Sequence, residues 1–433
     1  MKYRSLIFVL GVCALCFVAA NCSDGSDESN PGPSNMCQKE ISLRQMDIME
    51  DDTFDLGPYL QNPTQTGIVV KWRTLEETDG TVVYGEGDAL DMESSHEGSA
   101  TIHEVQLENL KPDTRYSYKV ISGAVESSVH HLYTAVKENQ GFRFTVWGDN
   151  QNGPDTFRQI LSAMAGQGPH FFLGVGDLVQ EGKDEPLWKE QLFDPGRKFF
   201  HELPFFTAIG NHERNADILY ELYAMPPNGN EGVRATNQSF TYGNAFFLIV
   251  DTNMVFFSPM EGVETDVSQW IKDQMHSEAA QNATWRIALA HEPGYSESWG
   301  NGSCHNDGNK YVRNYLLPDL EEAQFHVYLS GHTHNYERGM ENGMLHMITG
   351  GGGGSLDAWC RDWVQTRVAH HVHHYLTIEA GCDTLRIGAY DLDGAEFDWV
   401  TLKSDEYGAI VDEGPMENIP DPVMNDDSPT LTE

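Results

Sequence analysis

Short stretches in which apolar and polar residues alternate fill the chain between residues 54 and 137. The stretches lie at 67–74, 81–85, 103–107, 115–120 and 130–135, with Gly, Asp and Asn between them. Alternation with a period of two is typical of strands that bury one face, and no helical spacing of useful length accompanies it. The pattern predicts a small all-β sandwich over residues 54–137.

The pattern changes downstream of the predicted sandwich, where short apolar runs alternate with amphipathic segments. Apolar residues recur with helical spacing at 156–165, 267–276 and 316–323. Strands that alternate with helices predict an α/β domain, which we place at 138–403. A closing β-hairpin is expected around Asp393-Gly394, because this dipeptide favours a tight turn.

Five apolar runs of the predicted α/β domain each end in a polar cluster. The clusters are Gly148-Asp149-Asn150-Gln151, Gly176-Asp177, Gly210-Asn211-His212-Glu213, His291-Glu292-Pro293 and Gly331-His332-Thr333-His334. One such cluster means little, since a Gly-Asp pair after a strand is often only a turn. In an open α/β sheet, however, the carboxyl ends of the strands meet at one edge, where ligands bind. The series therefore predicts that carboxylate, amide and imidazole side chains gather at a common rim.

The types of side chain in these clusters favour a metal centre. Carboxylate oxygens and imidazoles suit first-row divalent or trivalent ions. A tetrahedral zinc site takes four ligands, whereas the clusters offer more. The surplus suits a pair of ions about 3.5–4 Å apart that share one bridging carboxylate.

The charge of the chain limits its partners. The sequence has 27 Lys and Arg against 66 Asp and Glu, a formal net charge of −39. Such a chain offers no basic surface to a nucleic-acid duplex. It also repels anionic substrates, so a phosphate would need a local cation, and two metal ions would supply one.

The motifs resemble those of the metallophosphoesterases (the calcineurin-like superfamily) and, among these, the purple acid phosphatases. The matching segments are GDN (148–150), GDLVQ (176–180), GNHE (210–213), AHEPGY (290–295) and GHTHNYER (331–338). The resemblance covers about residues 54–402, because the N-terminal β region is similar to the fibronectin type III-like domain of many such phosphatases. It includes the run 110–118, where a Tyr is expected to bond back to the preceding turn. The resemblance implies an α/β fold of two packed mixed β-sheets flanked by helices, preceded by the all-β sandwich.

Carried over position by position, the resemblance implies two metal ions, with Fe, Zn or Mn as candidates. The ligands implied for the first metal are Asp149, Asp177 and His334. The ligands implied for the second metal are Asp177, Asn211, His291 and His332, so Asp177 would bridge the pair. His212 would face the substrate as a general acid or phosphate donor and would not bind metal.

The chain departs from the family pattern at two positions near the first metal. Gln180 stands where the purple enzymes have the Tyr that binds ferric iron, and Gln151 stands where the wider superfamily has a His ligand. Both glutamines are candidates for a weak metal ligand or a substrate contact, and Gln151 could offer its neutral amide oxygen. We expect no purple colour and a less firmly held first metal. A phenolate-to-iron absorption band in the purified protein would contradict the first expectation.

The resemblance implies a metal-dependent phosphoester hydrolase that acts on a small-molecule phosphate ester. A phosphomonoesterase of the acid phosphatase type, using a metal-bound hydroxide and proton donation by His212, is the leading interpretation. Phosphodiester or nucleotide hydrolysis at the same centre is an alternative. A catalytically weak surface binding protein is another, because the first metal site lacks both the Tyr and the His.

Two further segments have candidate roles at the site. The run Gly350–Gly354 lacks the Lys-Ser/Thr of a P-loop, so we expect a loop near the site, with Trp359, Cys360 and Trp363 as candidate pocket walls. The histidines at 370, 371, 373 and 374 precede a strand. Alternation places them on opposite faces, so we expect a structural or rim role for them.

The first 21 residues are typical of an export signal. Lys2 and Arg4 precede an apolar run at 6–20, which is shorter than the ~20 residues needed to span a bilayer. Cys22 and the acidic stretch after it resemble the start of a bacterial lipoprotein, with a lipid anchor on Cys22. We expect an exported protein of the cell envelope or surface, with free secretion or a periplasmic location as the alternative.

The expected organisation has five parts. They are a signal peptide (1–21), an acidic linker (22–53), the sandwich (54–137), the catalytic domain (138–403) and an acidic tail (404–433). An exported chain retains disulfides, and four cysteines allow three pairings. Those cysteines are Cys37, Cys304, Cys360 and Cys382, with Cys304–Cys360 as the first expectation and free thiols as the alternative.

Overall fold

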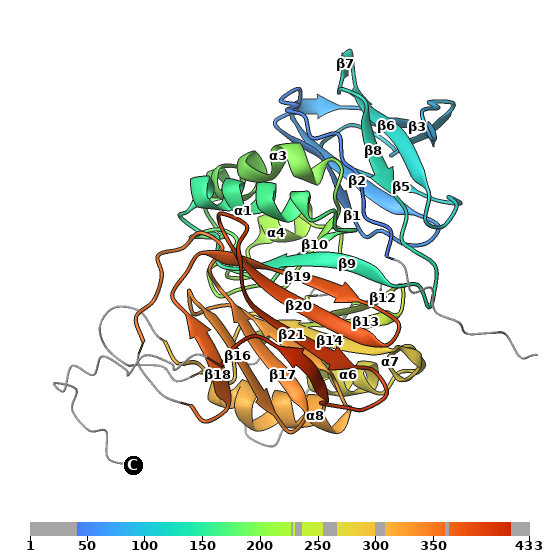
Figure 1. Ribbon diagram of the computed structural model, residues 1–433. Helices are drawn as coiled ribbons and strands as arrows, with labels where there is room; N and C mark the ends of the chain where they lie inside the picture. Colours follow the sequence, from blue (N-terminus) through green and yellow to red (C-terminus); the bar gives the residue numbers. More distant parts are fainter. Residues whose placement is uncertain are drawn as a thin grey trace, which may run out of the picture. The chain divides into compact units, whose positions relative to one another are not determined.

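The computed structural model describes residues 41–226, 228–229, 236–253, 266–298, 308–359 and 363–416 (Figure 1). All described residues belong to one compact unit, Cys37–Glu433. The expected signal peptide, Cys22 and most of the acidic tail lie outside the described residues, as do Cys37, Cys304 and Cys360. Cys382 is disulfide-bonded. Within the described ranges, no helix is both long enough and apolar enough to cross a membrane.

Two antiparallel sheets form the N-terminal β region. One sheet has the order β1-β2-β5, and the other has the order β4-β3-β6-β7 with β8 paired to β6. The strands are β1 (Leu56–Gln61), β2 (Ile68–Thr78), β3 (Thr81–Glu86), β4 (Met92–Ser95), β5 (Ala100–Leu107), β6 (Arg115–Ser122), β7 (Val125–Glu126) and β8 (His130–Tyr133). The expected strands are confirmed, and their inward side chains, including Trp72 and Tyr118, form one buried cluster. The hydroxyl of Tyr116 accepts from the backbone N–H of Lys111 at 2.9 Å, which confirms the expected tyrosine corner.

Two seven-stranded mixed sheets form the centre of the α/β region. Their orders are β11-β10-β9-β19-β20-β21-β22 and β12-β13-β14-β15-β17-β16-β18. The strands of the first sheet are β9 (Phe142–Trp147), β10 (Phe172–Gly174), β11 (Phe205–Thr207), β19 (His374–Ala380), β20 (Thr384–Asp391), β21 (Glu396–Lys403) and β22 (Ile410–Glu413). Those of the second are β12 (Gln238–Tyr242), β13 (Ala245–Val250), β14 (Trp285–Ala290), β15 (Val327–Ser330), β16 (Tyr336–Glu341), β17 (Met344–Thr349) and β18 (Thr366–His370). Both sheets contribute side chains to one buried cluster, in which the rings of Phe144 and Phe247 meet at 5.3 Å.

The five strand ends that carry polar clusters therefore belong to two sheets and not to one. The parallel strands β9, β10 and β11 lie in the first sheet, and β14 and β15 are parallel neighbours in the second. The two sets of loops meet because the sheets pack face to face. This arrangement confirms the expected fold of two packed mixed sheets.

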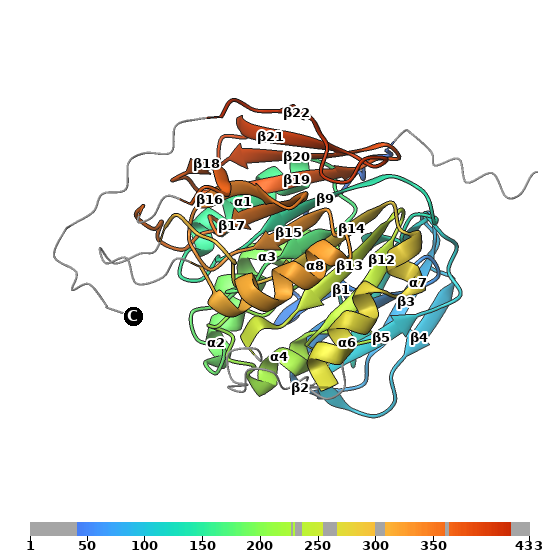
Figure 2. The same cartoon turned by 90° about the horizontal axis from the view of Figure 1, so that it is seen from below.

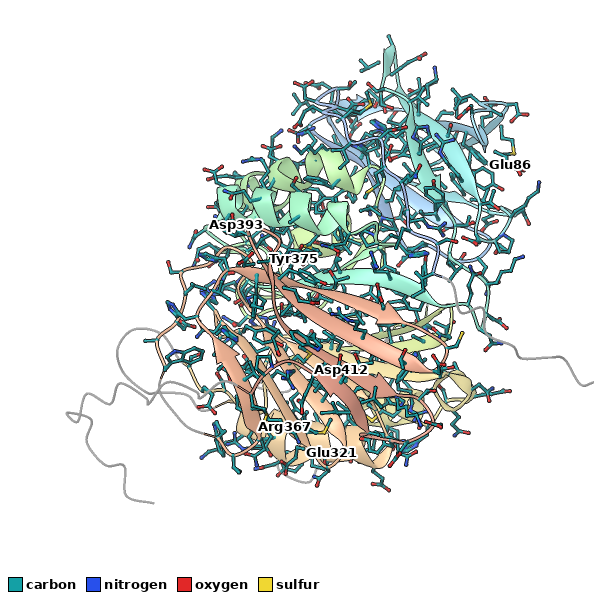
Figure 3. All side chains as sticks on the ribbon, viewed as in Figure 1. Glu86, Glu321, Arg367, Tyr375, Asp393 and Asp412 are labelled. Atoms are coloured by element: carbon teal, nitrogen blue, oxygen red, sulfur yellow. The ribbon has the colours of Figure 1, made fainter. Side chains whose placement is uncertain are left out.

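Helices cover the outer faces of both sheets. They are α1 (Pro154–Gly166), α2 (Glu185–Trp188), α3 (Asp194–Phe200), α4 (Asp217–Leu222), α6 (Asp266–Met275), α7 (Glu278–Asn282) and α8 (Leu317–Glu322), with π-helical turns η1 (Lys189–Phe193) and η3 (Val312–Leu316). Figure 2 shows α6 and α8 lying across the second sheet. On the first sheet Tyr375 lies beneath α1, and Gln167 Nε2 donates to its hydroxyl at 3.1 Å (Figure 3). The three helices expected from apolar spacing are confirmed as α1, α6 and the η3–α8 segment.

The first sheet continues past the expected hairpin. The hairpin around Asp393-Gly394 is confirmed as β20 and β21, which pair antiparallel. The strand β22 adds to β21, although it lies in the range for which we expect an acidic tail. Its Glu413 accepts from Nη1 of the fully buried Arg338 at 2.7 Å. The same guanidinium donates to Asp398 from Nε at 2.7 Å and from Nη2 at 3.1 Å, so Glu413 accepts from its remaining Nη1 and links β22 to β16.

The first strand of the β region also belongs to the core of the α/β region. Leu56 and Tyr59 of β1 are buried in the cluster that holds the helices of the first sheet. The ring of Tyr59 lies 4.8 Å from that of Phe193, and its hydroxyl donates to the carbonyl of Leu222 at 2.7 Å. The two regions therefore share apolar packing and do not meet only through a linker.

Tyr59→Phe tests this shared core. The substitution removes a buried hydrogen bond to α4 and should lower the free energy of unfolding by about 1–3 kcal/mol. Urea unfolding followed by tryptophan fluorescence measures it, because Trp147 and Trp285 report on the α/β region. Tyr84→Phe is the matched control, since its hydroxyl makes no hydrogen bond to the described residues. Equal stability of both variants would mean that the hydrogen bond from Tyr59 to Leu222 does not stabilise the contact between β1 and α4.

Candidate metal centre

The backbone turns sharply where three of the predicted ligands leave their strands. Asp149, Asp177 and His332 have φ angles of 59°, 51° and 71°, in the left-handed region. This region is uncommon for residues other than glycine, and Asp and His are among the side chains that adopt it most readily. Such conformations persist where the surrounding structure imposes them, and they cluster at functional sites.

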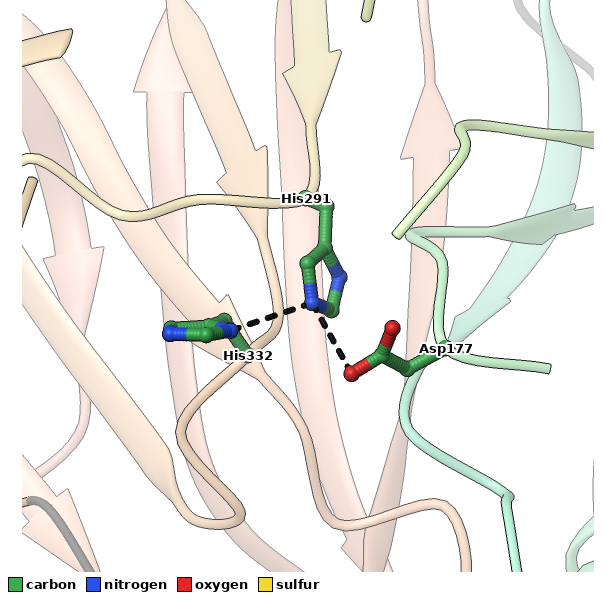
Figure 4. Close-up of side chains that lie close together, drawn as sticks. All are labelled: Asp177, His291 and His332. Carbon is green, nitrogen blue, oxygen red and sulfur yellow. Dashed lines mark hydrogen bonds and ion pairs between the residues drawn. The ribbon is translucent and has the colours of Figure 1, made fainter. Parts of the chain in front are cut away.

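The four residues predicted for the second metal meet around one ring nitrogen. His291 Nε2 lies 3.1 Å from Asp177 Oδ2 and 3.3 Å from His332 Nδ1 (Figure 4). It also lies 3.2 Å from Asn211 Oδ1. The other ring nitrogen, Nδ1, donates to the carbonyl of Val175 at 2.9 Å, which leaves Nε2 as the atom that faces the cluster. Three atoms with lone pairs thus surround a fourth, an arrangement that suits a cation better than a single shared proton.

The residues predicted for the first metal lie beside this group in a looser arrangement. His334 Nδ1 donates to the carbonyl of Ser355 at 2.7 Å, so its Nε2 faces inward, 3.7 Å from Asp149 Oδ1. The amide nitrogen of Gln151 lies 3.2 Å from His334 Nε2 and 3.4 Å from Asp177 Oδ2. Its amide oxygen is buried and has no hydrogen-bond partner in the part of the chain that the structure describes. A half-turn of this amide would give a cation its oxygen, so the donor set fits a metal here too.

His212 and Gln180 lie next to the metal-ligand cluster and hold each other. The backbone N–H of His212 donates to Asp177 Oδ1 at 2.9 Å, and its Nδ1–H donates to the carbonyl of Gln180 at 2.7 Å. His212 Nε2 lies 3.9 Å from Asp177 Oδ2. The amide oxygen of Gln180 accepts from Asn152 Nδ2, so this side chain is engaged away from the proposed ligands.

Burial sets the protonation of the centre. It raises the pKa of Asp149 well above its usual range, and the nearby charge of Asp177 adds to the effect. Burial would also raise the pKa of Asp177, but the His291 imidazole outweighs it and lowers that pKa to about 2. Burial disfavours protonation of His291, yet the carboxylates of Asp177 and Asp149 raise its pKa well above the usual value. Burial and the charge of His291 lower the pKa of His332 to about 3. A proton on His291 therefore supplies the positive charge that a metal ion would otherwise bring.

Two domain families match the chain, and together they cover both regions of the fold. Residues 142–336 match the calcineurin-like phosphoesterases, and residues 57–134 match the N-terminal domain of purple acid phosphatases. The chain is a purple acid phosphatase-like metallophosphoesterase. The membership confirms the resemblance on which the ligand set rests and implies a metal centre.

Individual relatives of this metallophosphoesterase are distant. Purple acid phosphatase 21 of Arabidopsis thaliana is 26% identical over 257 residues, which are 55% of this chain and 54% of that protein. Acid phosphatase type 7 of Danio rerio is 25% identical over 310 residues, 63% of this chain and 68% of that protein. The structure of a purple acid phosphatase from yellow lupin seeds superposes with a TM-score of 0.70 at 18% identity, covering 80% of this chain and 74% of that one. The chain thus spans little more than half of the Arabidopsis relative, and the structural likeness shows the fold alone.

Two buried glutamates support the ligands, and the strand-end pattern did not assign them a role. Glu213 accepts from the backbone N–H groups of Asp177, Leu178 and Gly210 at 3.0, 2.7 and 2.6 Å. Glu292 Oε2 lies 3.5 Å from His332 Nε2. Burial raises the pKa of each to about 7. Glu292 directly follows the predicted ligand His291, and Glu213 lies two positions after the predicted ligand Asn211. Position in the motif was therefore the available signal, but only the fold shows which groups the two glutamates contact.

A cavity of about 340 Å³ opens over the predicted ligands. Its described lining consists of Gln151, Asn152, Asp177, Gln180, Asn211, His212, His332, His334, Gly354, Ser355 and Asp357. The expectation that Trp359 and Trp363 wall the pocket is wrong for this lining. The backbone N–H of Trp363 instead donates to Glu297 Oε1 at 2.6 Å, and its ring packs on Tyr295. None of the four clustered histidines at 370–374 lines the cavity either.

The glycine run 350–354 packs directly behind the ligand loops. The N–H groups of Gly352 and Gly354 donate to the carbonyls of Gly148 and Asp149, each at 2.8 Å. A Cβ atom on Gly352 would lie 2.2 Å from the carbonyl oxygen of Gly148, and one on Gly354 would lie 2.7 Å from the His334 ring. The run is thus a close-packed support for the first metal position, because only glycine allows backbone to approach backbone this closely.

Gly352→Ala should displace the loop that carries Asp149. Overpacking of this kind costs about 1–3 kcal/mol, and we expect a loss of bound metal together with the loss of stability. Elemental analysis and thermal unfolding measure the two effects. Gly166→Ala at the end of α1 is the matched control, because a Cβ atom there would have no atom of the described residues within 4 Å. Full metal content in Gly352→Ala would show that the glycine run does not support the centre.

Proposed function

We propose that this metallophosphoesterase hydrolyses phosphate monoesters at a centre of two metal ions. The observation that carries the proposal is the position of Asp177 Oδ2. This oxygen lies 3.1 Å from His291 Nε2, on the second-metal side, and 3.4 Å from the Gln151 amide, on the first-metal side. One carboxylate oxygen thus faces both ligand sets, as a bridging ligand must.

The proposed ligands divide between the two positions as the family motifs imply. Asp149, Asp177 and His334 would hold the first ion, with Gln151 contributing its amide oxygen, and Asp177, Asn211, His291 and His332 would hold the second. The proposed ions are Fe, Zn or Mn. When bound, they supply Lewis acidity and an activated water at neutral pH.

His212 is the proposed proton donor to the leaving alcohol. Its Nδ1–H is committed to the Gln180 carbonyl, so Nε2 is the nitrogen that can face a substrate in the cavity. Its side chain is 28% exposed, whereas those of Asp177 and His291 are almost fully buried. A group that is open to the cavity and fixed in orientation suits general acid catalysis, since the proton must pass to a substrate atom.

The first metal position favours a second candidate function. Because Gln151 offers a neutral amide where the superfamily has an imidazole, the chain could hold one ion only and bind ligands without turnover. Metal content, combined with a panel of phosphate monoesters, diesters and nucleotides, separates the candidates. Two ions with monoester turnover support the proposal, preferential diester turnover would replace it, and one ion without turnover would favour the binding protein.

We also propose that the protein is exported and anchored through a lipid on Cys22. The apolar run and the cysteine that follows it support this placement. Metabolic labelling with a radioactive fatty acid tests it, with Cys22→Ser as the unlabelled control.

Asp177→Asn tests the bridging role. An amide cannot supply the charged oxygen that the two ions would share, so the metal affinity should fall. Loss of a residue that only supports a metal ligand lowers affinity by up to about 100-fold, and we expect a larger decrease for Asp177→Asn. Phosphomonoesterase turnover should be lost with the metals. Elemental analysis and a chromogenic monoester assay measure both quantities. Asp155→Asn, which changes an exposed carboxylate on α1, is the control and should alter neither. Near-normal turnover in Asp177→Asn would exclude the proposed centre.

Gln151→His tests the first metal position. The substitution provides an imidazole next to His334 and should raise the metal content of the protein at limiting metal concentrations. Gln159→His adds a histidine on the exposed side of α1 and controls for nonspecific binding. Unchanged metal affinity in Gln151→His would place the first ion away from this residue.

A further inference from the structure

We propose that the cavity selects phosphate monoesters whose alcohol part carries no second negative charge, and that Asp357 imposes this selection. The inference rests on the proposed phosphomonoesterase function and specifies its substrate class. It follows from the charges and hydrogen bonds of the cavity wall.

The carboxylate of Asp357 is held in the wall with one oxygen free. Its Oδ2 accepts from the backbone N–H of His334 at 2.9 Å, while the other oxygen has no hydrogen-bond partner among the described residues. The Asp357 carbonyl accepts from Asn335 Nδ2 at 2.9 Å, which fixes the same segment. The carboxylate therefore stands beside the first metal position without being a predicted ligand, and it presents a negative charge to whatever fills the cavity.

The described lining of the cavity contains no Lys or Arg to offset this charge. One phosphate would be neutralised by the two ions, whose charge exceeds that of Asp149 and Asp177. A second phosphate or a carboxylate on the same substrate would extend into the cavity, whose lining includes the carboxylate of Asp357. Two negative charges within one cavity repel each other more strongly where water is partly excluded than in bulk water. The net charge of −39 adds a field of the same sign.

The rest of the wall suits polar groups that are not anionic. Because His212 Nδ1–H donates to the carbonyl of Gln180, Nδ1 cannot accept from Gln180 Nε2, which lies 3.2 Å away. The amide N–H of Gln180 is therefore available to a hydroxyl oxygen of the leaving alcohol. The exposed side chain of Ser355 and the free oxygen of Asp357 can meet further hydroxyl or ammonium groups.

A series of three substrates tests the proposal with the metal-loaded full chain. Phosphoethanolamine, glycerol 3-phosphate and 3-phosphoglycerate place a cation, a hydroxyl and a carboxylate in comparable positions. We expect kcat/KM for the carboxylate ester to be at least about tenfold below the other two, which corresponds to about 1.4 kcal/mol. In Asp357→Asn the penalty should fall below about threefold, because the amide oxygen can still accept from the His334 N–H while the charge is gone.

Ser355→Asp provides a test in the opposite direction and does not depend on the stability of the first variant. A second carboxylate on the exposed rim should increase the penalty for 3-phosphoglycerate. Equal kcat/KM for all three esters, or the same ratios in both variants as in the unchanged chain, would overturn the proposed selection.

Calorimetry separates failure of this inference from failure of the proposed function. Binding of inorganic phosphate and of pyrophosphate to the metal-loaded protein needs no turnover. The preference for phosphate over pyrophosphate should decrease in Asp357→Asn and increase in Ser355→Asp. If no ester is hydrolysed but this preference shifts as expected, the phosphatase proposal fails and the charge selection stands. If esters are hydrolysed and the preference does not shift, the charge selection fails alone.

Discussion

Two carboxylates buried within one small volume determine the chemistry of this protein. Asp149 and Asp177 lie at the ends of neighbouring strands, and both are almost completely shielded from water. Two such charges cannot remain side by side without positive charge between them. Without a metal ion, the proton on His291 has that role, and Asp149 tends to keep its own proton. The surrounding loops, the supporting glutamates and the glycine run all contact the segments that place side chains around these two carboxylates.

The support for the centre comes from segments far apart in the chain. Glu213, after β11, binds backbone N–H groups of the loop after β10, and Gly352 and Gly354, after β17, bind carbonyls of the loop after β9. The loops after β9, β10 and β11 are thereby each tied to a loop from another strand. Such ties hold the predicted ligands in place, which would reduce the conformational entropy lost on binding of an ion.

The strand ends and the polar side chains that follow them could be predicted from the sequence because that information is local. An apolar run that predicts a strand is followed directly by the polar residues Gly-Asp or His-Thr-His, as at Asp177 and His332. The strand and its candidate functional side chains can therefore be identified from the same few residues. The division of the rim between two sheets could not be predicted from spacing, since strand order depends on long-range packing. The strand β22 was missed because its Glu413 is paired with Arg338, a partner more than seventy positions away. The roles of the glycine run and of Asp357 likewise depend on which loops approach each other, and no local pattern records that.

The hydrogen bond from His291 Nδ1 to the carbonyl of Val175 has a wider consequence. His291 follows β14 of the second sheet, whereas Val175 follows β10 of the first, so a single imidazole spans the seam between the layers. An ion held by His291 and Asp177 would cross-link the same seam a second time. Removing the ion by chelation should therefore loosen the contact between the two sheets. On heating, release of the ion and separation of the sheets should then occur together as one coupled event.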